Sequence, residues 1–150
     1  MQRFAEVSQE DEWGCAAACV ASLIAVPYER AKRWLVKEKG AAVSAKHKGF
    51  EVDEIARALF KQGTKVIADW NPPATLPDGT IVCLYSRVRF RDFHYVLKVP
   101  GGYMDPWFDL KQDKLEAKWR PALPKGTQVY VALIPVSCAW ATSGTARRPR

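Results

Sequence analysis

The sequence has no run of about 18 consecutive apolar residues, the length that a membrane-spanning helix needs, so we expect no membrane span. Its N-terminal stretch, MQRFAEVSQEDEWG, lacks the apolar core of a signal peptide, so Sec-dependent export is not expected either. A cytoplasmic location is the default that follows, and export by another route, as an effector, stays open. Four cysteines in 150 residues are too few for a disulfide scaffold, which favours a reducing compartment.

Histidine is scarce too, because the chain holds only His47 and His94. Cys15 and Cys19 lie four residues apart, but no second cysteine pair occurs at the spacing of a zinc site. We therefore expect this chain to need no metal and no cofactor.

The rest of the composition is that of an ordinary globular protein, with 48% hydrophobic and 26% charged residues. It predicts one domain, residues 1–140, followed by a basic, disordered tail, residues 141–150. The tail holds Arg147, Arg148 and Arg150 and so carries three of the seven net positive charges. The mild excess left on the domain is typical of a solvated surface, and we expect no specific nucleic-acid partner. The sequence leaves the oligomeric state open.

Helical patterns come first along the chain and strand patterns follow. Apolar spacing predicts helices over residues 15–25, 27–38 and 51–63, and the first of these is apolar on every side, as in a fully buried helix. Runs rich in β-branched and aromatic residues predict strands over residues 64–70, 80–86, 94–99, 102–107 and 128–136. This order favours an α+β domain with helices packed on an antiparallel sheet. Residues 109–127 show no pattern that we can assign.

Cys15 is the candidate nucleophile, because it lies where the first helix begins, directly after Gly14. The free N–H groups and the positive dipole end of a helix N-terminus both favour the thiolate, the form that attacks carbonyl groups. Cys19 lies one turn further into the helix and is expected to be an inert packing thiol. Cys83 and Cys138 occur in apolar, strand-like runs and should also be buried thiols.

A nucleophilic cysteine needs a base, and the chain offers two histidines. His47 lies between two lysines, in what we expect to be a solvated loop. His94 begins the apolar run HYVLKV, where a strand would hold the ring rigidly, although a purely structural role is the commoner one for such a histidine.

Hairpin geometry supplies a partner for His94. If Pro100 and Gly101 form a two-residue turn, Asp105 lies on the same face as His94 and diagonal to it, about 7–8 Å away and within side-chain reach. A three-residue loop would instead put Asp105 on the opposite face. Asp92 and Asp109 are less suited, because one precedes the strand and the other follows a proline.

Acyl transfer also needs donors for the developing oxyanion. The backbone N–H of Cys15 is one candidate, and the side-chain amide of Gln9 is a second. We assign Trp13, Gly14 and Trp107 to substrate binding, with core packing as the alternative for the two tryptophans.

Taken together, these residues resemble the papain-like cysteine peptidases, in which Gln, Cys, His and Asp or Asn occur in this order. The likeness is nearest to the bacteriocin-processing peptidase domain of bacterial export transporters, which removes leaders after a double glycine, and to its stand-alone relatives. The family stretch Cys-Gly-x-Ala-Cys-x-Ala corresponds to CAAACVA at residues 15–21, and the His strand, short turn and Asp-Pro correspond to HYVLKVPGGYMDP. The likeness covers about residues 5–108.

This resemblance implies a papain-like fold and a thiol-dependent hydrolase that cleaves a peptide or protein substrate. Cys15 would be the nucleophile, His94 the base, Asp105 its orienting partner and Gln9 the oxyanion-hole side chain.

The chain departs from the family at Ala16, which replaces a glycine and could crowd the substrate. It also lacks the transporter's membrane and ATPase parts, so its substrate need not be a double-glycine leader. An inactive relative that binds proteins or peptides is the alternative, favoured by the acidic run Glu10-Asp11-Glu12, since carboxylates disfavour a nearby thiolate.

Overall fold

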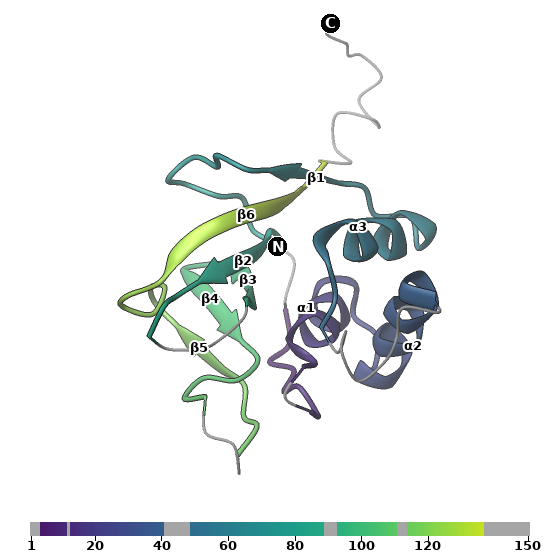
Figure 1. Ribbon diagram of the computed structural model, residues 1–150, viewed down its shortest axis with the longest axis horizontal. Helices are drawn as coiled ribbons and strands as arrows, with labels where there is room; N and C mark the ends of the chain where they lie inside the picture. Colours follow the sequence, from purple (N-terminus) through teal and green to yellow (C-terminus); the bar gives the residue numbers. More distant parts are fainter. Residues whose placement is uncertain (1–3, 12, 41–48, 89–92, 111–113, 137–150) are drawn as a thin grey trace, which may run out of the picture.

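The computed structural model describes residues 4–11, 13–40, 49–88, 93–110 and 114–136. Three helices pack on one side of a six-stranded antiparallel sheet, so the α+β architecture predicted from the sequence is confirmed (Figure 1). The helices are α1 (Cys15–Ile24), α2 (Tyr28–Lys39) and α3 (Val52–Lys61). The strands are β1 (Val66–Asp69), β2 (Ile81–Tyr85), β3 (His94–Val99), β4 (Gly102–Asp105), β5 (Lys118–Arg120) and β6 (Gln128–Pro135).

Helix α1 lies between the sheet and α2 (Figure 1). Every residue from Cys15 to Leu23 is buried, as the all-round apolar pattern predicted. Its alanines have high helix propensity and let the neighbouring elements approach closely. The helix ends where Ala25 adopts a left-handed conformation, with Pro27 soon after, so the chain turns back into α2.

Helix α3 begins with a capping box formed by Glu51 and Glu54, which satisfies two N–H groups at its start. Ile55 and Leu59 are completely buried. Phe60, in contrast, is 66% exposed.

The sheet has the strand order β1-β6-β2-β3-β4-β5. The central strands β2 and β3 are buried along most of their length, which explains their nearly continuous apolar sequence. One side of the sheet packs against α1, and a smaller apolar cluster around Val82, Val96 and Ala132 covers the other side.

Strand β5 is the element that the sequence did not predict, because it has only three residues and lies within the unassigned region 109–127. It pairs with β4 and also holds the N-terminal segment. The N–H of Trp119 donates to a Glu6 carboxylate oxygen at 2.8 Å, and the N–H of Ala117 donates to Ser8 Oγ at 2.9 Å. These bonds bring the segment that leads into α1 alongside the end of β4.

Several expectations concern residues outside the described ranges: the solvated loop of His47, the buried thiol of Cys138 and the tail 141–150. Among the helices that the structure describes, none is long and apolar enough to cross a membrane.

Candidate active site

Three side chains that lie far apart in the sequence meet at the start of α1. Cys15 is the first residue of α1, His94 the first of β3 and Asp105 the last of β4. His94 Nε2 lies 2.7 Å from Asp105 Oδ1, and the Cys15 side chain is a second hydrogen-bonding partner of the ring. Because Nε2 faces Asp105, Nδ1 is the ring nitrogen left to the thiol. We call these three residues the Cys–His–Asp cluster.

The hairpin between β3 and β4 brings His94 and Asp105 together. Its register pairs Val99 with Gly102 and Leu97 with Met104, so the turn has two residues, and the alternative of a three-residue loop is excluded. Gly101 adopts φ of +79°, a conformation that glycine takes at little cost. The predicted proximity of His94 and Asp105 is therefore confirmed.

The environment of His94 favours the charged imidazolium. Burial alone would lower its pKa, but the hydrogen bonds to Asp105 and Cys15 outweigh it and raise the pKa of His94 to about 10. The ring therefore carries a proton at neutral pH. No side chain caps the N-terminus of α1 and no acidic residue lies in its first turn, so the positive end of the helix dipole is not compensated at Cys15.

Gln9 lies beside the start of α1 and is 1% exposed. Its Nε2 donates to the backbone carbonyl of Asp11 at 2.9 Å, and its backbone N–H reaches the Pro106 carbonyl at 3.4 Å. Nε2 carries two hydrogens, so one donor remains after the bond to Asp11. Gln9 Oε1, in contrast, is buried and has no hydrogen-bond partner among the described residues.

Asp11 holds the turn that leads from Gln9 to Cys15. Its carbonyl also accepts the N–H of Gly14 at 3.1 Å, and its carboxylate accepts the N–H of Trp13 at 3.0 Å. Lys32 pairs with the same carboxylate and Tyr28 donates to it. Burial raises the pKa of Asp11, but the bond to Lys32 and the other donors lower it overall. The charge of Asp11 is thus compensated locally by Lys32.

The residues assigned to substrate binding are not equally placed for that role. Gly14 faces Tyr28, and a Cβ there would lie 1.9 Å from the Tyr28 hydroxyl oxygen, so this glycine is needed for packing. Trp107 is 7% exposed, whereas Trp13 is partly exposed. Ala16, which could have crowded the substrate, is 1% exposed and belongs to the hydrophobic core.

Arg120, on β5, is a neighbour of the cluster that the sequence did not reveal. Its Nε lies 3.2 Å from Asp105 Oδ2, the oxygen that does not face His94. The only available signal was an arginine in the unassigned region, and nothing in its spacing points to Asp105.

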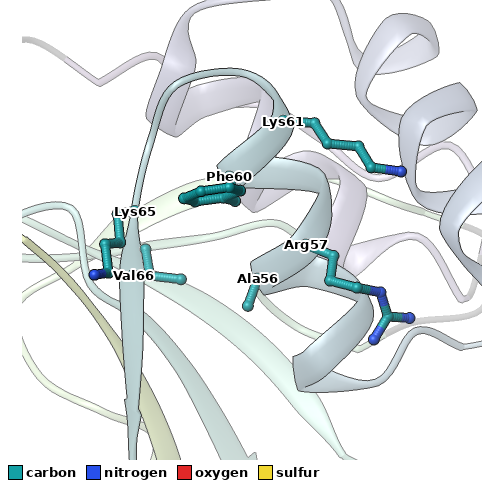
Figure 2. Close-up of a pocket in the computed structure, with 6 residues that line it drawn as sticks. All are labelled: Ala56, Arg57, Phe60, Lys61, Lys65 and Val66. Carbon is teal, nitrogen blue, oxygen red and sulfur yellow. The ribbon is translucent and has the colours of Figure 1, made fainter.

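A shallow hollow of about 380 Å³ lies elsewhere, between α3 and β1, where Phe60 and Val66 face it while Arg57 and Lys61 extend away (Figure 2). It contains no member of the Cys–His–Asp cluster. Within the described ranges, no three His, Cys, Asp or Glu side chains come together as metal ligands.

We expect Cys15 to react with iodoacetamide faster than the other two described cysteines at about pH 6. Burial, with the nearby Cys15, raises the pKa of Cys19 well above its ordinary value and that of Cys83 to about 12, so both stay protonated. Cys15 has the imidazolium of His94 beside it. Mass-spectrometric mapping of labelled peptides measures the three rates, and equal labelling of Cys15 and Cys83 would contradict the assignment of the nucleophile.

We compared the chain with protein-family models and with curated proteins. No protein-family model matches the chain, and a search of curated proteins finds no significant match. The assignment of a function therefore rests on the geometry of the site and on the sequence motifs that build it.

Proposed function

We propose that this chain is a thiol-dependent hydrolase, a cysteine peptidase of the papain-like type that cleaves a peptide or related amide bond. The observation that carries the proposal is the hydrogen-bonded series from Cys15 through His94 to Asp105, placed at the N-terminus of a buried helix. Nucleophile, base and orienting carboxylate in this arrangement are what acyl transfer through cysteine requires.

In the acylation half of the reaction, the Cys15 thiolate attacks the carbonyl carbon of the scissile amide. The electron pair of the C=O bond moves to oxygen, and the N–H of Cys15 and the free Nε2 hydrogen of Gln9 stabilise the oxyanion. When the intermediate collapses, the C–N bond breaks, and the leaving amine takes the proton from His94. A thioester with Cys15 remains.

In the deacylation half, His94 is neutral and accepts a proton from water as the oxygen of that water attacks the thioester. Collapse of the second intermediate breaks the C–S bond and releases the carboxylic acid. Cys15 returns as thiolate beside protonated His94. Asp105 holds the ring in place throughout and stabilises its charged form.

A peptide library tests this proposal. We expect the wild-type chain to cleave a subset of the peptides, and Cys15→Ala to abolish cleavage, because the substitution removes the attacking atom. Cys83→Ala is the matched control, since it removes another buried thiol of the same domain, and it should retain activity. Mass spectrometry should also detect a thioester on Cys15 after rapid acid quenching.

The alternative, an inactive domain that binds peptides, gives a different result. Peptides would then be retained by both the wild-type chain and Cys15→Ala, with no cleavage by either. Cleavage that survives in Cys15→Ala would contradict the proposed mechanism.

A further inference from the structure

We propose that Arg120 is a positioning residue for the reaction assigned above: it fixes the carboxylate of Asp105 so that one oxygen is held against His94. This inference rests on the proposed function for its effect on turnover. Its structural part concerns the His94–Asp105 pair alone and can be tested without any substrate.

The two oxygens of Asp105 have separate partners. Oδ1 faces His94 Nε2 at 2.7 Å and also accepts the N–H of Trp107 at 3.2 Å. Oδ2 faces Arg120 Nε at 3.2 Å. The carboxylate is almost completely buried, so no bulk water is available to take the place of a lost partner. A rotation of the carboxylate away from His94 would therefore break several contacts at once.

Arg120 is itself held in place by three features. One terminal nitrogen donates to the carbonyl of Phe108 at 3.1 Å, and the guanidinium carbon lies 4.4 Å from the centre of the Phe108 ring. Its side chain is 12% exposed, so most of the charge is withdrawn from solvent. A planar, permanently charged group anchored at both ends suits the orientation of a carboxylate better than a flexible cation does.

The contact between Arg120 and Asp105 is an ion pair rather than a well-aligned hydrogen bond. Nε is within ion-pair distance, yet its N–H has no aligned acceptor among the described residues. The geometry therefore leaves the stronger, shorter bond of Asp105 to His94, while the arginine compensates the second oxygen. A buried carboxylate that lost this cation would be free to seek another donor.

Strand β5 also provides a matched control. Lys118 is opposite Asp105 in the strand register, but its ammonium group lies near Glu116 and over the Phe108 ring at 5.5 Å. Lys118→Met thus removes a basic side chain from the same strand and the same ring without removing a contact to Asp105. Arg120→Met removes the corresponding charge at similar length.

The kinetic test compares five variants, including Asp105→Asn alone and combined with Arg120→Met, on a peptide that the wild-type chain cleaves. Arg120→Met should lower kcat roughly 10- to 100-fold with little change in KM, because a misplaced orienting group affects the reacting geometry more than binding. Arg120→Lys should recover part of the loss, and Lys118→Met should behave as wild type. In an Asp105→Asn background, Arg120→Met should add less than about threefold, since Arg120 acts through Asp105.

The second test uses nuclear magnetic resonance of the protein labelled with ¹⁵N-histidine, with His47→Ala to assign the two rings. Arg120→Met should shift the Nε2–H resonance of His94, and Lys118→Met should leave it in place. This readout holds even if no peptide is cleaved, so failure of the proposed function is distinguishable from failure of this inference. If Arg120→Met does not fold, as judged by thermal unfolding, Arg120→Gln, which also removes the charge but keeps a polar side chain, takes its place and should shift the same resonance.

Three results would overturn the inference. The first is an unchanged His94 resonance in a folded Arg120→Met or Arg120→Gln variant. The second is an Arg120→Met variant at least as active as Arg120→Lys, since packing without charge would then suffice. The third is a double variant, Asp105→Asn with Arg120→Met, whose loss of kcat equals the product of the two single losses. Arg120 would then act independently of Asp105.

Discussion

Replacing His94 by alanine is expected to lower turnover by about three to six orders of magnitude, the largest loss of any variant except the removal of Cys15. The charged ring donates to Asp105 on one side and to Cys15 on the other, and no other described side chain bridges these two residues in this way. Without the imidazole, neither the thiolate nor the leaving amine has a proton partner. Steady-state assays on a cleaved peptide measure the loss.

His47→Ala is the control for this variant, because it removes the second histidine of the chain. It should keep full activity, since the Cys–His–Asp cluster contains His94 alone. If His47→Ala and His94→Ala lose activity equally, the base has been assigned wrongly.

The turnover of Asp105→Asn should lie between that of His94→Ala and that of His47→Ala. An asparagine oxygen still accepts from His94 Nε2, but the amide carries no charge to stabilise an imidazolium. The structure adds a cost in stability, because the variant leaves Arg120 buried without its anion, and breaking a buried pair typically costs about 3–5 kcal/mol. Turnover of Asp105→Asn should therefore be compared at a temperature where thermal unfolding shows it to be folded.

Gln9→Ala is expected to lower turnover by about 10²–10³, the usual effect of removing one oxyanion donor, while stability changes little. The substitution loses the Nε2 bond to the Asp11 carbonyl, worth about 1 kcal/mol. It also removes Oε1, a buried acceptor without a partner, whose desolvation costs about 1–3 kcal/mol. These two contributions to the free energy of unfolding have opposite signs. We therefore expect Gln9→Ala to lose turnover while its stability stays close to that of the wild-type chain.

Gln128→Ala is the matched control, because Gln128 begins β6 and is exposed. It should leave both turnover and the thermal midpoint unchanged. Turnover of Gln9→Ala within about threefold of wild type would remove Gln9 from the site. A large drop in its thermal midpoint would show instead that Gln9 mainly supports the turn at Asp11.

Much of this architecture is local in origin and was predictable. The alanine-rich run after Gly14 determined a buried helix that begins at Cys15, and its polar boundary placed the thiol at the helix start. The two-residue turn at Pro100 and Gly101 determined the register that brings Asp105 to His94. Both follow from short-range rules, since helix periodicity and hairpin parity depend only on residues close together in the chain.

The remaining features depend on contacts between residues distant in sequence, which no local pattern encodes. The meeting of α1 with the β3–β4 hairpin, which puts Cys15 beside His94, depends on packing across the core. Strand β5 has only three residues and forms because β4 and the N-terminal segment offer it partners. Arg120 lies near Asp105 because β5 pairs with β4. Hydrophobic spacing thus determined the helices and the strands other than β5, and the burial of charged and polar groups between those elements decided which residues support the site.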